Sequence, residues 1–358
     1  MRSCNQRNSG KKRLLPGIFF ALLSLLLVLP LQAQAISIGT FNIEYFNVSG
    51  KRAYSPEDCK ALAERIRNSG AEVLALQEIE GNATMRFFVT KFLPGWKYAG
   101  NDTGGRQDLY FLWKNSIKLL DDPTAYGANA SFRFEGKSYK LHDRPILVGK
   151  FSDPRSGRVF TLVNVHLKSQ STRGKEDQER AERYNNAKRA EQIAWINKLV
   201  ASLSGPVFIL GDYNVENPQG TDFPLLGLPR GKQSYDNTRS NLDYIGYTGI
   251  SKGPSWKIYE VESAIQARST RNSQHPDHDM VILSLDGQGI VSGKGGTASP
   301  QVSLPPKMPT GGEDRIVYVT KTGKKYHEEG CSSLSKSKIP ISLKEAIGKG
   351  YIPCKRCH

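Results

Sequence analysis

Long apolar runs, cysteines and acidic residues are all scarce in this chain of 358 residues. Only the stretch Leu14–Leu31 approaches the length of about 20 apolar residues that spans a membrane, which excludes a protein built from several membrane helices. There are five cysteines, and three of them fall in the last 28 residues. That distribution excludes a network of disulfide bonds running through the whole protein.

Acidic residues are outnumbered by basic ones, 34 against 50, which gives a formal net charge of +16. Residues 1–35 contain five basic residues and no acid, so subtracting them leaves +11 for the rest of the chain. A surplus of this size favours a polyanionic partner, such as nucleic acid or acidic lipid. It does not choose between the two.

Residues 1–35 have the composition of an export signal. A basic start precedes the apolar run, Pro30 interrupts it, and Ala33-Gln34-Ala35 provides a cleavage site before Ile36. We therefore expect a secreted or periplasmic protein with no stable membrane association once the signal is removed. The alternative is an uncleaved segment that anchors the protein in a membrane.

Composition divides the remaining chain into three parts. Residues 36–286 alternate apolar runs with polar turns, residues 287–312 form a linker rich in Gly, Pro and Ser, and residues 313–358 form a small basic module. In the first part, strands alternate irregularly with two clear helices, one starting at Ser55 and one near Glu176. This pattern predicts a layered α/β domain with mixed sheets rather than a regular parallel repeat.

The stretch PVFILGDYNV, residues 206–215, combines a predicted buried strand with polar residues at its end. Asp212 and Asn214 are separated by Tyr213, so in extended backbone their side chains point to the same side. Polar groups at the end of a buried strand often form a site. An Asx turn that closes the strand is the alternative explanation for the same residues.

Other predicted strands repeat this arrangement. Polar residues end them at Asn42, Glu78, His166 and Asp277-His278, and Asp243 lies within a further short strand. Carboxylate and amide oxygens are the ligands that Mg²⁺, Mn²⁺ and Ca²⁺ prefer. A histidine beside a carboxylate suits proton transfer or stabilisation of a phosphoryl group. Turn formation alone does not explain so many polar strand ends, so we predict an active site with a divalent ion.

Six sequence blocks occur in the order FNIE, LQEIE, NVHLKS, GDYN, LDYI and PDH. Together they resemble the endonuclease/exonuclease/phosphatase superfamily, which includes pancreatic-type deoxyribonuclease, apurinic endonucleases and sphingomyelinases. The resemblance spans residues 36–286, which would be the catalytic domain. It implies a four-layer α/β sandwich, in which two mixed β-sheets pack face to face with helices outside.

The resemblance also implies roles at the ion and at the attacking water. Glu78 matches the metal-binding glutamate of the family, Asn42 its neighbour in the metal and phosphate network, and Asp277 adds negative charge beside the metal. The ion would be Mg²⁺, with Mn²⁺ or Ca²⁺ as alternatives. Asp212 would orient or deprotonate the water, while Asn214 holds a phosphate oxygen.

Further matches concern the phosphate and the substrate. His278 would contact the scissile phosphate, with Asp243 orienting its ring, and His166 matches the second histidine of the deoxyribonuclease branch. Arg144 resembles a phosphate-contacting arginine ahead of the middle strands. Lys168, two residues beyond His166, is expected to bind substrate as well.

The C-terminal module has its own candidate site. His327, Cys331, Cys354 and Cys357 have the spacing of a closed Cys₃His site for structural Zn²⁺. A disulfide bond or free thiols are the alternatives, since export would permit a disulfide. The module resembles the metal-binding part of alkylation-repair Ada proteins, and from Glu313 onward ten basic residues against five acids give +5. That charge suits a tether to nucleic acid, whereas no protein partner is indicated.

These observations lead to an exported, metal-dependent nuclease, an endonuclease acting on DNA, with RNA left open. The alternative is a sphingomyelinase-like phosphodiesterase or phosphatase acting on lipid head groups. A lipid enzyme would expose an apolar hairpin to the membrane, and residues 131–141 are the only candidate, although they carry several charges. A third hypothesis, a binding protein without activity, conflicts with the intact Glu78, Asp212, Asn214 and His278.

Overall fold

The computed structural model describes residues 35–50, 53–226, 228–229, 231–250, 255–260, 276–285, 307–308, 316–342, 345–346, 349, 351–354 and 357. The expected export signal lies outside these residues except for Ala35, and so does the expected linker except for residues 307–308. None of the described helices has both the length and the apolar composition needed to cross a bilayer.

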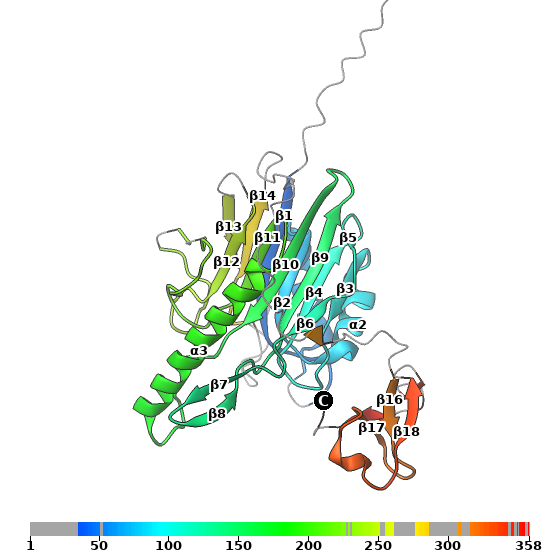
Figure 1. Cartoon of the computed structure of the whole chain (residues 1–358). Coiled ribbons are helices and arrows are strands. Elements are labelled where there is room, and N and C mark those ends of the chain that lie inside the picture. The colour runs from blue at the N-terminus through cyan, green and yellow to red at the C-terminus, as the bar shows by residue number, and fades with distance from the viewer. Residues whose placement is uncertain are drawn as a thin grey trace, which may run out of the picture. The chain divides into compact units, whose positions relative to one another are not determined.

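Two mixed β-sheets form the centre of the catalytic domain (Figure 1). The first sheet has the strand order β13 (Ser255–Tyr259), β14 (Met280–Leu285), β1 (Ile36–Phe46), β2 (Val73–Ile79), β4 (Asp108–Lys114), β3 (Trp96–Gly100). The second has the order β12 (Asp243–Thr248), β11 (Val207–Asp212), β10 (Arg158–His166), β9 (Ile146–Asp153), β6 (Thr124–Tyr126), β15 (Lys307–Met308), and β5 (Lys118–Leu119) also pairs with β9. Each sheet contains one parallel pair, β1–β2 in the first and β10–β11 in the second.

Helices cover the outer faces of both sheets. Helices α1 (Pro56–Asn68) and α2 (Gly81–Phe92) pack on the first sheet, and their buried side chains share one apolar cluster with those of β1, β2 and β4. Helix α3 (Gln178–Ala201) packs on the second sheet through its apolar stripe (Figure 1). A third apolar cluster joins the inner faces of the two sheets. The predicted four-layer α/β sandwich is therefore confirmed.

The first and the last strands of the domain are neighbours. β1 pairs antiparallel with β14 from Ile36↔Leu285 to Thr40↔Val281. Between them, the hydroxyl oxygens of Ser37 and Ser284 lie 3.2 Å apart although they are separated by 247 residues. The sheet that carries the beginning of the domain is thus completed only by its end.

A short hairpin, β7 (Ser131–Phe134) and β8 (Lys137–Lys140), corresponds to the segment that the lipid hypothesis would use. Its aromatic rings surround Tyr184 of α3, with centroid distances of 5.5 Å for Phe132, 5.4 Å for Phe134 and 5.2 Å for Tyr139. The apolar side of the hairpin therefore packs within the protein.

The C-terminal module forms a four-stranded sheet of its own. The strand order is β18 (Ile339–Ser342), β16 (Ile316–Val319), β17 (Lys325–His327), β19 (Ile352–Pro353), and a short 3₁₀ helix, η2, spans Ser332–Leu334. Its larger apolar cluster contains only four buried side chains among the described residues, Val317, Val319, Ile341 and Ala346. A core this small needs a further stabilising element, such as a metal ion.

Candidate active site and metal centres

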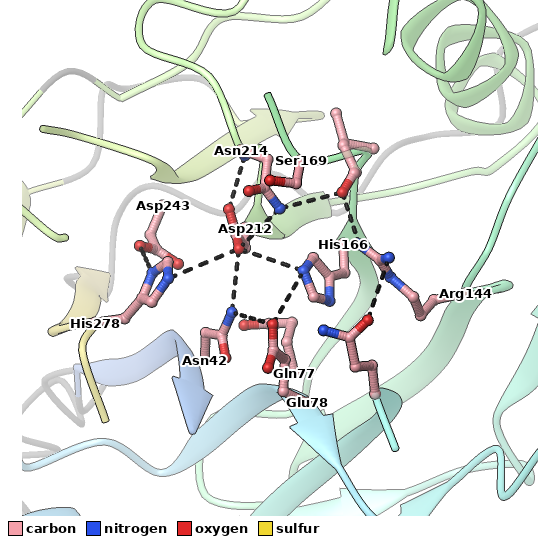
Figure 2. A network of polar contacts seen from close by, with 12 residues as sticks. Asn42, Gln77, Glu78, Arg144, His166, Ser169, Asp212, Asn214, Asp243 and His278 are labelled. Carbon is pink, nitrogen blue, oxygen red and sulfur yellow. Dashed lines mark hydrogen bonds and ion pairs between the residues drawn. The ribbon is translucent and has the colours of Figure 1, made fainter. Parts of the chain in front are cut away.

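The polar strand ends converge because of the two parallel pairs. Parallel strands finish at the same edge of a sheet, so Asn42 of β1 lies next to β2, which carries Glu78, and His166 of β10 lies opposite Asp212 of β11. Face-to-face packing of the sheets then brings both edges together. Figure 2 shows Asn42 and His166 against the carboxylate of Asp212, with Glu78 in contact with both of them.

The backbone bends sharply where the site residues stand. Tyr45, Glu78 and Asn214 all have positive φ, at 49°, 62° and 54°, which is uncommon for residues with side chains. The pairing of β1 with β2 also shifts register between Asn42 and Phe46. Such irregularities redirect side chains at strand ends and concentrate at functional sites.

Asp212 and Asn214 do point toward each other, but for a different reason from the one expected. Because Asn214 is in the left-handed region, the simple alternation of an extended strand is wrong there. The backbone N–H of Asn214 donates to Oδ1 of Asp212 at 2.7 Å, and its side-chain amide donates to Oδ2 at 3.1 Å. The first of these bonds is an Asx turn, so turn formation and a functional carboxylate coexist in the same residues.

Asp212 is held from several sides. The amide of Asn42 donates a further hydrogen bond to its Oδ2 at 3.1 Å, and only 1% of the residue is exposed. Burial is the main reason why the pKa of Asp212 is raised to about 7, although the charge of His278 opposes this rise. An oriented carboxylate with a pKa near 7 can accept a proton from water at neutral pH.

His278 and Asp243 form a closely bonded pair. Nδ1 of His278 lies 2.6 Å from Oδ2 of Asp243, while Nε2 faces Asp277 at 3.8 Å and Asp212 at 3.9 Å. Burial opposes the charged ring, but the nearby carboxylates, led by that of Asp243, outweigh it and raise the pKa of His278 to about 10. The ring is therefore a buried cation at neutral pH.

The second histidine differs in its charge. Nε2 of His166 lies 3.4 Å from Oδ2 of Asp212 and 3.6 Å from Oε1 of Glu78. Burial, assisted by the charge of Arg144, lowers the pKa of His166 well below its usual range. The site therefore contains one neutral imidazole, His166, and one positively charged imidazole, His278, which can only donate hydrogen bonds.

Glu78 and its neighbours supply the oxygens that a divalent ion prefers. The backbone N–H of Tyr45 donates to Oε2 of Glu78 at 3.1 Å, and Asn42 donates to Oε1 at 3.4 Å. Asp212, Asp243 and His278 form a second set whose ligand atoms lie within 4.8 Å of one another. Because Asp243 is already bonded to Nδ1 of His278, we interpret that set as an acid–base pair. The carboxylate of Glu78, with Asp212 nearby, fits Mg²⁺, Mn²⁺ or Ca²⁺ better.

The remaining predicted residues lie around this centre. Asp277 stands on the His278 side, where its Oδ2 accepts a hydrogen bond from Asn237 at 2.6 Å. Arg144 donates from Nη2 to the carbonyl of Leu167 at 2.7 Å, and the same carbonyl accepts the amide of Asn214 at 3.1 Å. Arg144 is therefore joined to the site through one shared carbonyl.

Lys168 lies outside the hydrogen-bonded network. Its backbone N–H donates to Gln192 at 2.9 Å, and its carbonyl accepts Arg189, also at 2.9 Å. Burial lowers the pKa of its ammonium group, which makes no side-chain hydrogen bond with a described residue. The structure thus brings together the other predicted residues more closely than this one.

Two buried amides beneath the site had no predicted role. Nε2 of Gln77 donates to Oδ1 of Asn164 at 2.7 Å, and Nδ2 of Asn164 donates to the carbonyls of Leu76 and Tyr110 at 3.0 Å each. Asn164 belongs to one sheet and its three partners to the other. This bridge fixes the separation of the two sheets, and its signal in the sequence was a polar residue inside each apolar strand.

The four predicted zinc ligands of the C-terminal module do converge. The ligand atoms of His327, Cys331, Cys354 and Cys357 all lie within 4.8 Å of one another. Nδ1 of His327 is 3.4 Å from Sγ of Cys331 and 4.0 Å from Sγ of Cys357, and the cysteines are free thiols. Neighbouring ligands around a tetrahedral zinc are separated by roughly 3.3–3.8 Å, so this cluster could hold Zn²⁺.

Hydrogen bonds also reach the sulfur atoms of this cluster. The backbone N–H of Glu328 donates to Sγ of Cys357 at 3.4 Å. Burial opposes ionisation of Cys331, but hydrogen bonds, the largest from the Ser333 backbone, lower the pKa of its thiol to about 6. The pKa of the neighbouring Cys357 thiol shifts the other way, to about 12, because burial and the sulfur of Cys331 oppose its ionisation. The convergence of the four ligand atoms, rather than the ionisation of one thiol, therefore favours the metal.

Known proteins resemble the chain in sequence pattern and in fold. A model of the Endonuclease/Exonuclease/phosphatase family matches residues 39–263. The structure of humanized D. rerio TDP2 with 14 mutations is 14% identical, has a TM-score of 0.50, and matches 70% of this chain and 98% of that one. Truncated Caenorhabditis elegans TDP2 is 15% identical with a TM-score of 0.51, over 73% and 99% of the two chains. No curated protein matches the sequence.

Proposed function

The chain belongs to the endonuclease/exonuclease/phosphatase family, and from that membership we propose that it is an exported, metal-dependent endonuclease acting on DNA. The family predicted from the six ordered blocks is thereby confirmed, and with it a phosphoester-hydrolysing enzyme. The proposal concerns the substrate, the metal, the mode of cleavage and the export. RNA is the second nucleic acid to test.

The observation that carries the proposal is the arrangement around Asp212. Three hydrogen bonds, two from Asn214 and one from Asn42, fix the direction of its carboxylate. We assign Asp212 the role of general base, which orients a water molecule and takes its proton as the water attacks phosphorus. A pKa raised to about 7 by burial matches this task, because the group is partly ionised and still basic at neutral pH.

Opposite this base stands a fixed positive charge. The imidazolium of His278 can donate from Nε2 to a phosphate oxygen, since its Nδ1 is occupied by Asp243 at 2.6 Å. Charge increases on the phosphate oxygens in the transition state, so a preorganised donor there lowers the barrier. The ring of His166, whose lowered pKa keeps it neutral, lies 3.4 Å from Asp212. It would donate a hydrogen bond to the phosphate from that side.

A divalent ion at Glu78 would polarise the phosphate and neutralise its charge. Glu78 would be the main protein ligand, with Asn42 holding the carboxylate in place at 3.4 Å. The same amide of Asn42 donates to Asp212, so the proposed base and the proposed ion ligand share one hydrogen-bond donor. The chain thus arranges its base, its cation and its carboxylate ligand around one position for the phosphate.

The hairpin favours nucleic acid over lipid, whereas the charge suits either polyanion. The surplus of +11 beyond residue 35 attracts a polyanion, as expected for proteins that bind phosphate backbones. The hairpin β7–β8 turns its aromatic rings onto Tyr184, while its outward positions carry Arg133, Lys137 and Lys140. It therefore lacks the exposed apolar surface that inserts into a membrane.

One assay tests the proposal. The mature chain, residues 36–358, would be incubated with plasmid DNA, RNA and sphingomyelin, each with Mg²⁺ and with EDTA. We expect nicked and linear plasmid with Mg²⁺ alone. Hydrolysis of sphingomyelin without cleavage of either nucleic acid would replace the proposal with the lipid alternative, and activity that survives EDTA would remove the metal from it.

A further inference from the structure

A hollow opens directly beside the proposed ligand Glu78. It has a volume of about 220 Å³, and the residues of its wall that bear on its chemistry are Tyr45, Arg106, Gln107, Asp108, Asp143 and Arg144. We call it the arginine pocket. Two contacts connect it to the active site, the bond from Tyr45 N–H to Glu78 and the carbonyl of Leu167 that Arg144 shares with Asn214.

The guanidinium groups of the pocket make few direct ion pairs, although the charges of Asp143, Glu78 and Asp212 act on Arg144. Arg144 bonds to the carbonyl of Leu167 and, at 3.5 Å, to the amide oxygen of Gln107, and makes no ion pair with a carboxylate that the structure describes. Arg106 has one long, exposed ion pair with Glu80, at 3.5 Å. Two guanidinium groups in one wall are suited to an anionic group, because their donors match phosphate oxygens.

The two acidic residues in the pocket wall bond to residues other than its arginines. Both oxygens of Asp108 accept hydrogen bonds from Thr103. The carboxylate of Asp143 pairs with Nζ of Lys188 at 2.8 Å. Neither acid is paired with an arginine of the pocket, so the guanidinium groups remain available to a ligand.

An aromatic ring stands at the edge of the pocket. Tyr45 is 37% exposed, which is unusual for a large side chain beside a buried network, and the guanidinium of Arg106 lies 5.0 Å from its ring centroid. An exposed ring flanked by a cation is the arrangement on which proteins stack single-stranded bases. The ring is also well positioned, since its own backbone N–H is bonded to Glu78.

We propose that the arginine pocket binds the nucleotide next to the scissile phosphate, with its base stacked on Tyr45 and its phosphate held by Arg106. The inference rests on the proposed nuclease function and makes it more specific. The size of the pocket supports it, because pockets for free small ligands usually measure about 300–1,000 Å³. A hollow of about 220 Å³ accommodates one unit of a longer substrate.

The test compares two substrates on the full chain with Mg²⁺. One is a short single-stranded oligonucleotide, and the other is bis(p-nitrophenyl) phosphate, a small diester with no flanking nucleotide. The variants are Tyr45→Ala, Tyr45→Trp and Arg106→Gln. Phe87→Ala is the matched control for the ring, since Phe87 is also 37% exposed but does not line the pocket, and Arg133→Gln is the control for the charge.

We expect Tyr45→Ala and Arg106→Gln each to lower kcat/KM for the oligonucleotide about tenfold or more relative to kcat/KM for the small diester. Tyr45→Trp should preserve the ratio because a larger ring still stacks, and both controls should match wild type. Equal loss on both substrates, or no loss on the oligonucleotide, would overturn the pocket assignment alone. A wild-type chain that hydrolyses the diester but not the oligonucleotide would overturn the proposed function as well.

Discussion

Nδ1 of His278 lies 2.6 Å from Oδ2 of Asp243, and the two side chains are buried together. Asp243 begins β12 of the second sheet, and His278 lies just before β14 of the first. The carboxylate therefore does two things for the ring. It fixes the ring plane so that Nε2 faces the site, and it keeps the ring protonated where burial alone would discharge it. The proposed contact with the phosphate depends on both.

Replacing Asp243 should change how the rate depends on pH. In Asp243→Asn the largest charge that raises the pKa of His278 is lost, so this pKa falls from about 10 and the ring loses its proton as the pH rises through a lower value. The alkaline limb of the kcat/KM profile should move to lower pH. The measurement is a profile from pH 5 to 10, with exposed Asp222→Asn as control. An unshifted limb, whatever the rate, would rule out this role.

Asp212→Asn should separate activity from stability. We expect turnover to fall by roughly 10²–10⁴-fold, because the proton acceptor is lost. The folded-state pKa of Asp212 is raised to about 7, so its ionisation destabilises the fold as the pH rises from about 4 to 7. The difference in unfolding free energy between the variant and wild type should therefore shift in favour of the variant as the pH rises from 4 to 8. The shift is at most about 1.4 kcal/mol for each unit by which folding raises the pKa of Asp212. Urea unfolding in EDTA at both pH values measures this gain, and a constant difference would contradict it.

Glu78→Gln should weaken the ion and the reaction together. The substitution keeps the shape of the side chain but removes the charge that a hard cation requires. We expect a higher Mg²⁺ concentration for half-maximal rate and a lower maximal rate. Metal titrations of activity after EDTA treatment provide the measurement, with exposed Glu64→Gln as control. An unchanged metal titration would mean that other residues bind the ion.

His142 should make the domain sensitive to acid without taking part in catalysis. Its ring packs 5.0 Å from that of Trp195, and burial, more than the nearby charge of Lys188, lowers its pKa to about 3. The unfolded chain takes up a proton below about pH 6.5 and the folded chain does not, so stability is lost as the pH falls toward 3. This ring should cost the wild-type protein about 2 kcal/mol of unfolding free energy between pH 7.5 and pH 5, and His142→Phe should not show that part of the decrease. Urea unfolding at the two pH values would show equal losses if the ring is not responsible.

The C-terminal module should carry one zinc ion per chain. Four converging ligand atoms, one of them a histidine nitrogen that has no role in a disulfide, favour the metal over a disulfide. Cys354→Ser should lose the zinc, whereas Cys59→Ala should keep it because Cys59 lies in the core of the catalytic domain. Elemental analysis counts the metal, and mass spectrometry without reductant reports any disulfide. A chain that contains a disulfide among these cysteines and no zinc would disprove the assignment.

The position of each site residue at the end of a strand could be predicted because its cause is local. Apolar runs fix the strands, and the polar residue after each run is then placed at a strand end, as with Asp212 after Val207–Leu210. His166 and Asp212 became partners in register because both end strands of one parallel pair. Sequence periodicity places these residues at strand ends, but it does not show which strands pair or in which direction.

Other features depended on contacts that no local pattern records. Helix α2 was not predicted because Glu80, the residue at its N-cap, makes no side-chain capping bond and its first turn contains no acid. The left-handed backbone of Asn214 arises from its bonds to Asp212 and to the carbonyl of Leu167. The arginine pocket joins residues from the end of β1, from the segment that leads into β4 and from the loop before β9, so only the folded chain shows it.

The pairing of β1 with β14 sets the earliest moment at which a newly made chain can become active. Asn42 and Glu78 are synthesised early, but the imidazole of His278 leaves the ribosome just ahead of the strand that completes the first sheet. A growing chain therefore has the carboxylates of the site before it has their cation. For the proposed nuclease, this order of assembly withholds the imidazolium that would contact the phosphate until the domain is complete.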